Sequence, residues 1–202
     1  MAEVQNLCVY CGSSNLVAPK FLEAAFAFGR IMGRAKLGLI YGGGRVGLMG
    51  RVADGVLAEG GRVTGIIPEH LHRREVAHDA VTELLVVGSM HERKQRMAER
   101  ADAFVVLPGG YGTLEEMFEI VTWRQLGLHD KPIVLVDLDG YWQALERLVD
   151  HFATQGFISP SNRALYQKVD RIDEVLPALA AARPAAHPLV SERRRGCGAQ
   201  HQ

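Results

Sequence analysis

The chain has 202 residues, a length that suits one domain with a single hydrophobic core. Hydrophobic residues make up 48% of it and charged residues 23%, which is the composition of an ordinary soluble globular protein. Because 23 basic and 23 acidic side chains balance to a net charge of zero, the composition argues against broad binding to nucleic acid, while a local cationic pocket stays compatible with it.

Short apolar runs recur along the chain and predict strands. They are almost continuously apolar, as expected of parallel strands that helices cover on both faces. Six runs show this pattern: 7–11, 37–41, 62–67, 83–87, 103–107 and 132–138. Amphipathic helical patterns lie between or after them at 48–56, 114–121 and 142–152. The alternation predicts an α/β, three-layer Rossmann-like fold in which helices flank a central parallel sheet.

The end of the chain differs from the rest in composition. Residues 172–182 are expected to form the last helix of a single domain that spans residues 1–182. Residues 183–202 are rich in proline, arginine and small side chains, which predicts a mobile C-terminal tail with no part in the chemistry. We expect no secretory signal and see no stretch as long as a membrane span, so the predicted location is the cytoplasm, without a membrane partner.

Two of the three cysteines, Cys8 and Cys11, form a CxxC spacing. A zinc or redox site is one interpretation of that spacing. Both residues belong to an apolar run, and no second CxxC or nearby histidine pair completes a metal site. We therefore expect buried thiols on a first strand, and no metal.

Glycine-rich loops follow three of the expected strands. They read CGSS at 11–14, YGGGRVG at 41–47 and PGGYGT at 108–113. Parallel strands bring these loops to one edge of the sheet, where glycine lets main-chain N–H groups approach an anion and each following helix begins with partial positive charge. The convergence predicts a phosphorylated ligand. Tight turns are the alternative, and for Gly12 alone we favour it.

The second loop matches the dinucleotide fingerprint GxGxxG at residues 42–47. A single match is weak evidence, and the next expected strand ends in GIIP at 65–68, without the acidic residue that would bind a ribose. The loop also lacks the Gly-Lys-Ser/Thr of a P-loop. NAD and ATP are therefore poor first choices, and we expect no cofactor.

The third loop runs into a helix that carries a carboxylate in its first turn. Thr113 and Glu116 have the spacing of a capping box, in which each side chain bonds a main-chain N–H at the start of a helix. The alternative is that Glu116 faces a sugar bound beside the loop. The two interpretations are compatible if they apply to different ligation states.

The segment at residues 90–97, MHERKQRM, predicts a helix that starts just after Gly88-Ser89. Met90, Arg93, Lys94 and Met97 share one face of it, and the methionines mark that face as inward. Two cations on an inward face are costly unless they meet an anion. The alternative is a salt bridge to a neighbouring acid, with the lysine extending outward, and the pattern supports both equally.

Together these motifs resemble the LONELY GUY family of cytokinin riboside 5′-monophosphate phosphoribohydrolases. The family hallmark PGGxGTxxE stands at 108–116, and its companion, an arginine–lysine pair between methionines, stands at 90–97. VYCGSS at 9–14, YGGG at 41–44 and TWxQLG at 122–127 match as well. The resemblance covers residues 6–182 without a departure at the motif positions.

The resemblance implies an enzyme that hydrolyses the N-glycosidic bond of N6-modified AMP, and often of AMP, to free base and ribose 5-phosphate. It assigns catalysis to Arg93 and Glu116. It implies that further residues bind the substrate or its phosphate: Gly12, Ser13, Gly43, Gly44, Glu75, Met90, Lys94, Gly109, Gly110, Tyr111, Gly112, Thr113, Leu114 and Glu115. It also implies a homodimer with sites near the subunit interface, and a small-molecule nucleotide as the partner.

Many relatives carry an older label, lysine decarboxylase. That chemistry normally needs pyridoxal phosphate on a Schiff-base lysine, and Lys94, the only lysine in a motif, stands beside an arginine that would compete for the same anion. Two rival functions stay open. One is a nucleotide-binding carrier without turnover, and the other, ranked lower, is an NAD-linked enzyme that uses residues 42–47.

Overall fold

The computed structural model describes residues 4–72 and 77–182. These residues form one seven-stranded sheet in the order β4-β3-β2-β1-β5-β6-β7, and every paired strand is parallel to its neighbour. The strands are β1 Asn6–Tyr10, β2 Gly38–Tyr41, β3 Val63–Pro68, β4 Glu83–Val87, β5 Ala103–Val106, β6 Ile133–Val136 and β7 Gln167–Val169.

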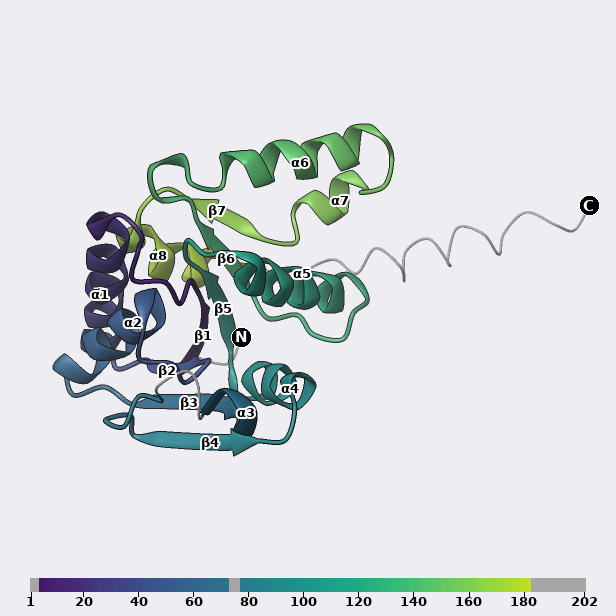
Figure 1. Cartoon of the computed structure of the whole chain (residues 1–202). Helices are drawn as coiled ribbons and strands as arrows, with labels where there is room; N and C mark the ends of the chain where they lie inside the picture. The colour runs from purple at the N-terminus through teal and green to yellow at the C-terminus, as the bar shows by residue number, and fades with distance from the viewer. Residues whose placement is uncertain (1–3, 73–76, 183–202) are drawn as a thin grey trace, which may run out of the picture.

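Helices cover both faces of this sheet, which confirms the predicted three-layer α/β fold (Figure 1). On one face α1 Pro19–Arg34, α2 Gly47–Ala58 and α8 Val175–Ala181 pack on the strands. The opposite face carries α4 Met90–Arg100, α5 Tyr111–Gln125 and α6 Gln143–Thr154. The short elements are α3 Glu69–His72, η1 Leu138–Gly140, α7 Pro160–Arg163 and η2 Ile172–Glu174.

The central strands are buried on both sides, as the continuous apolar runs predicted. In β1, Leu7 and Val9 belong to the core beneath α1 and α2, whereas Cys8 and Tyr10 face the core beneath α4 and α5. All four side chains are at most 2% exposed. The alternation of side chains along a strand therefore divides one apolar run between two cores.

Five elements were not among those expected: α1, β7 and the short α3, η1 and α7. α1 buries Ala25, Phe28, Gly29 and Met32 at helical spacing, a pattern that the sequence analysis missed, and a Cβ on Gly29 would overlap the main-chain carbonyl of Val52 in α2. β7 is only three residues long, and its Gln167 and Lys168 are exposed, so it carries no apolar run. Residues 172–182, expected as one helix, form η2 and α8.

The chain order creates a gap in helix coverage at the middle of the sheet. From β1 the chain moves outward through β2, β3 and β4, then returns to place β5 on the other side of β1. The loops after β1 and β5 therefore leave the same edge in opposite directions, and such a switch point is where open α/β sheets bind ligands. Among the described residues, no helix has the length and apolar character to cross a membrane.

Candidate functional site

A cavity of about 560 Å³ opens at this switch point. The glycine loops after β1 and β5 form its floor, and residues from α1, α2, α4 and α5 line its walls. The predicted site residues that line it are Gly12, Ser13, Met90, Arg93, Gly109, Gly110, Tyr111, Gly112, Thr113 and Glu116. A single cavity therefore brings together ten of the sixteen residues that the sequence assigned to the site.

The two loops on the floor are bonded to each other. The Gly12 N–H donates to the carbonyl of Pro108 at 3.0 Å, and the Gly12 carbonyl accepts the N–H of Leu48, at the start of α2, at 2.9 Å. Gly12 thus ties together β1, β5 and α2. Its role exceeds the tight turn that the sequence favoured for it.

The start of α5 presents free main-chain donors to the cavity. Gly110 is the N-cap residue, and no side chain bonds the first turn. The first N–H groups of a helix carry partial positive charge, which suits an anion such as a phosphate. Gly110 and Gly112 have open space where a side chain would stand. The capping-box interpretation of Thr113 and Glu116 is wrong, because both residues lie inside the helix and neither caps it.

Arg93 is buried against the carboxyl ends of two strands. Its Nε donates to the carbonyl of Ile66 in β3 at 3.1 Å, and its Nη2 donates to the carbonyl of Gly42, just after β2, at 3.0 Å. The side chain is 6% exposed. The salt-bridge alternative does not describe Arg93, since main-chain carbonyls hold its guanidinium. Nη1 contacts the Met90 sulfur at 3.8 Å, and Arg93 lines the cavity wall.

Glu116 places its carboxyl group in the same wall, one turn into α5. Burial raises the pKa of this carboxyl group to about 7, although the positive charge of Arg93 acts to lower it. Glu115 and Glu119 raise the pKa further by repulsion, and Lys94 opposes them. A carboxyl group with a pKa near neutrality can exchange a proton at physiological pH, as an acid or base in catalysis must.

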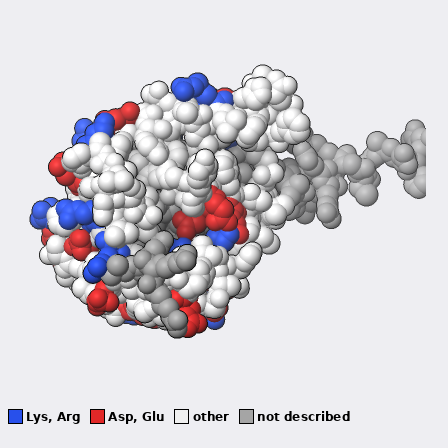
Figure 2. Space-filling view, in the orientation of Figure 1, with Lys and Arg blue, Asp and Glu red and all other residues white. Residues whose placement is uncertain are grey.

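Lys94 forms ion pairs with two glutamates of α5 that do not line the cavity. Its ammonium donates to Glu115 and, at 3.0 Å, to Glu119, so the salt-bridge alternative describes it correctly. Burial lowers the pKa of Lys94, but these two hydrogen bonds more than offset burial, and the net shift is upward. Figure 2 shows acidic side chains gathered over the start of α5, with a basic one beside them towards α4.

Five other predicted site residues lie outside the cavity wall. Gly43 adopts φ +78° and packs against Ile66, Ile67 and Leu84, away from the cavity. Gly44 forms a bridge with Ala77. Lys94, Leu114 and Glu115 also do not line the cavity, and Glu75 lies outside the described residues.

The cavity wall also contains residues that the sequence analysis did not select. Apolar side chains from α1 and the loop before it, from α2, from α3 and from the segment after β6 complete it: Val17, Phe21, Leu48, Met49, Leu71 and Tyr141. Gly42 was missed as well, although its carbonyl holds Arg93 and a Cβ on it would overlap Arg93 Nη2. The first GG pair of YGGG was the available signal for Gly42, whereas the apolar residues have no distinctive motif.

The CxxC spacing does not form a metal or disulfide site. Cys8 and Cys11 are both buried and unpaired, which confirms the interpretation as core thiols. Burial raises the pKa of each thiol well above its ordinary value. A buried thiol with a raised pKa holds little thiolate, so these cysteines are poor nucleophiles.

Fold and cavity together define a Rossmann-like α/β protein with a site built for an anion at its topological switch point. The profile of a protein family described as "Possible lysine decarboxylase" matches residues 49–179. A probable cytokinin riboside 5′-monophosphate phosphoribohydrolase of Oryza sativa subsp. japonica is 46% identical over 86% of this chain and 79% of its own length. The cytokinin riboside 5′-monophosphate phosphoribohydrolase LOG7 of Arabidopsis thaliana is 42% identical over 93% of this chain and 87% of its own length. The chain belongs to this LONELY GUY family.

Solved structures agree on the fold. A molybdenum cofactor carrier protein of Chlamydomonas reinhardtii superposes with a TM-score of 0.68 at 20% identity, over 88% of this chain and 97% of its own. A molybdenum cofactor binding protein of Rippkaea orientalis superposes with a TM-score of 0.67, also at 20% identity, over 90% of this chain and 98% of its own. At this identity the likeness shows the Rossmann-like architecture alone.

Proposed function

We propose that this protein hydrolyses the N-glycosidic bond of adenosine 5′-monophosphates, including N6-modified ones, to free base and ribose 5-phosphate. The observation that carries the proposal is the shared cavity, in which a buried cation, a carboxyl group and an uncapped helix start surround one space. The activity for which relatives at 42–46% identity are named supports the same reaction.

The 5′-phosphate would bind at the start of α5. Gly110 and Gly112 leave room for a phosphate against the main chain, and Thr113 adds a hydroxyl group in the cavity wall. Main-chain N–H groups at a helix N-terminus favour a doubly charged phosphate without needing a lysine. This placement directs the ribose further into the cavity, towards Arg93 and Glu116.

The chemical step breaks the bond between C1′ and N9 of the nucleotide. Positive charge develops on the ribose as the base leaves with the bonding electrons, and an ionised Glu116 would stabilise that charge. Glu116 would also orient the water whose oxygen bonds to C1′, and would accept its proton. Arg93, which lines the cavity, would hold the phosphate or a water that protonates the leaving base, and the proton accepted by Glu116 would return to that water.

The proposal is tested by incubating the protein with AMP and with isopentenyladenosine monophosphate and measuring release of free base. Glu116→Gln should lower kcat at least about a hundredfold, because it removes the general base and the negative charge. Glu119→Gln is the matched control, since it makes the same change one helical turn further along α5 and outside the cavity wall. The control should retain activity.

Three outcomes would contradict the proposal. Full activity of Glu116→Gln would remove this residue from the mechanism. Loss of cooperative melting in that variant would instead show a structural role. A native protein that melts at a higher temperature with nucleotide yet releases no base would be a carrier.

We further propose that two chains associate as a homodimer in the cytoplasm. Exposed apolar side chains on and after α5 support association: Phe118 is 39% exposed, Leu126 55% and Leu128 68%. Trp123 and Leu128 also line a hollow between α4 and α5. Light scattering should give the mass of two chains, and Leu128→Glu should lower the measured mass towards that of one chain. A monomeric native protein would contradict this proposal.

A further inference from the structure

Tyr141 contacts the anion loop from a distant part of the chain. It follows η1, after β6, and its hydroxyl group donates a hydrogen bond to the carbonyl of Gly109 at 2.7 Å. The ring lines the cavity and is 42% exposed. Edge-to-face contacts with Phe21 and Trp142, at 5.6 and 4.8 Å between ring centroids, fix its plane.

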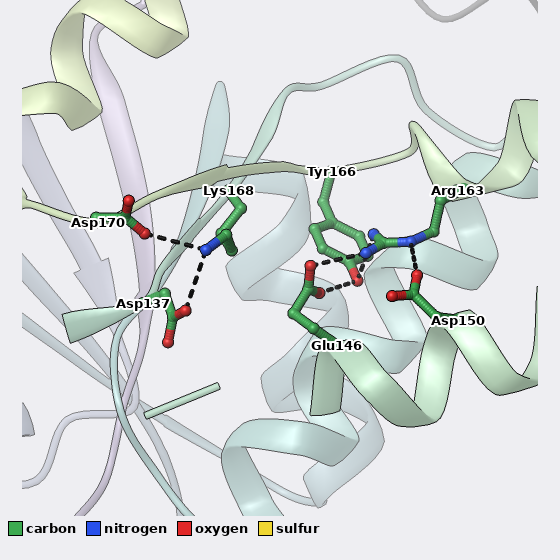
Figure 3. Close-up of polar contacts among 7 residues, drawn as sticks. All are labelled: Asp137, Glu146, Asp150, Arg163, Tyr166, Lys168 and Asp170. Atoms are coloured by element: carbon green, nitrogen blue, oxygen red, sulfur yellow. Dashed lines mark hydrogen bonds and ion pairs between the residues drawn. The ribbon is translucent and has the colours of Figure 1, made fainter. Parts of the chain in front are cut away.

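The turn that carries Tyr141 is itself held firmly. Asp137, 2% exposed, accepts the main-chain N–H of Trp142 at 2.6 Å, and its other oxygen accepts from Lys168 at 3.2 Å. Lys168 also donates to Asp170 at 3.0 Å, as Figure 3 shows. The turn requires two left-handed residues, Asp139 with φ +53° and Gly140 with φ +73°. Such a conformation persists only where surrounding contacts enforce it.

The Gly109 carbonyl matters because it shares a peptide unit with the Gly110 N–H. In a planar trans peptide the two groups point in opposite directions, so a bond that fixes the carbonyl also fixes the N–H. A peptide between two glycines has little steric resistance to rotation. Without Tyr141, the carbonyl oxygen at the cavity wall would also be free to face an incoming anion and repel it.

We propose that Tyr141 is a positioning residue that orients the Gly109–Gly110 peptide to bind the phosphate of the nucleotide. This inference rests on the function proposed above. It deepens that function because it explains how the site would prefer nucleoside monophosphates to nucleosides. The preference would depend on the hydrogen bond from Tyr141, which lies outside the loop motif, to Gly109. Tyr141 acts through Gly109 and takes no part in breaking the glycosidic bond.

The test compares Tyr141→Phe with Tyr166→Phe. Tyr166 donates to Glu146 at 2.6 Å in the cluster with Arg163 and Asp150, outside the cavity wall (Figure 3), so each variant loses one bonded hydroxyl group and keeps its ring. Calorimetry measures the affinity for ribose 5-phosphate and AMP, and competition measures the affinity for adenosine. Tyr141→Phe should lower the affinity for both phosphate esters about tenfold, which is the effect of one lost hydrogen bond. Adenosine binding and kcat should change less than about twofold. Tyr166→Phe should lower only the melting temperature.

Each result decides between the two proposals. If native protein binds and hydrolyses AMP, and Tyr141→Phe binds ribose 5-phosphate as tightly as native protein does, the positioning role is overturned while the proposed function stands. An equal loss for AMP and adenosine would also overturn it, since it would show a general distortion of the cavity. If the native protein neither binds nor hydrolyses AMP, the proposed function fails and this inference fails with it.

Discussion

Two glycine-rich loops, at 42–47 and 108–112, look alike in the sequence, but their glycines have different surroundings in the structure. In the first loop the glycines are required by protein atoms: a Cβ on Gly42 would overlap Arg93, and one on Gly47 would overlap the Ser13 main chain. In the second loop Gly109 is similarly confined by Thr113, but Gly110 and Gly112 adjoin empty space. The first loop accepts a hydrogen bond from Arg93, and the second leaves its main chain open to a ligand.

The difference explains why a glycine motif does not by itself identify a binding loop. Lack of a side chain permits close approach of any group, and that group can be the protein's own arginine or a bound phosphate. If this distinction holds, substitutions in the first loop should damage stability and activity together. In the open part of the second loop they should affect binding alone.

Gly42→Ala should have the largest effect. The added methyl group would displace Arg93 Nη2 and break its bond to the Gly42 carbonyl. Overpacking and a lost charged hydrogen bond together should cost about 2 to 4 kcal/mol, and kcat/KM should fall at least about a hundredfold. Urea unfolding and base release measure the two effects. A variant of native stability would refute the packing role given to this glycine.

The pH dependence should have the next largest effect, because Glu116, in the helix that follows the second loop, has a pKa near neutrality. With a pKa of about 7 for Glu116 and its ionised form active, kcat/KM should rise about tenfold per pH unit below 7 and level off above it. A pKa raised above the unfolded value means that the folded state binds the proton more tightly. Stability should therefore fall as pH rises from 4.5 to about 7.

Glu116→Gln supplies the control for that assignment, since an amide does not titrate. Its melting temperature relative to native protein should be higher at pH 8 than at pH 5. The same relative melting temperature at both pH values would show that another group causes the pH dependence of stability.

Gly112→Ala should have a smaller and purely functional effect. The methyl group meets no protein atom, and alanine favours a helix over glycine by about 0.5 to 1 kcal/mol, so the melting temperature should stay or rise. A methyl group in the phosphate space should raise KM for AMP about tenfold, through loss of one charged hydrogen bond. An unchanged KM would show that the phosphate binds elsewhere.

Lys94→Met should have the smallest effect. Its ammonium bonds Glu115 and Glu119 outside the cavity wall, so it can reach the phosphate only through its electric field. KM should rise about two- to threefold and stability fall by about 1 kcal/mol. A loss of activity as large as that predicted for Gly42→Ala, which displaces Arg93, would show that the lysine turns into the cavity when substrate binds.

The sequence predicts the fold well because most of its determinants are local. The apolar run at 7–11 and the inward face of α4 with Arg93 and Met97 follow from the spacing of adjacent residues, and the structure confirms both. Tyr141 and the carbonyl partners of Arg93 could not be predicted in this way. They depend on contacts between segments 27 to 51 residues apart, for which the sequence has no periodic pattern.

The position of β1 between β2 and β5 has a consequence for how the protein acquires activity. Arg93 precedes β5 and Glu116 follows it, so the first half of the chain supplies the cation and the second half supplies the acid. During synthesis the segment up to α4 can emerge and collapse while it is still inert. Chemistry begins only when β5 docks beside β1, so a protein split between α4 and β5 should work only after its two fragments recombine.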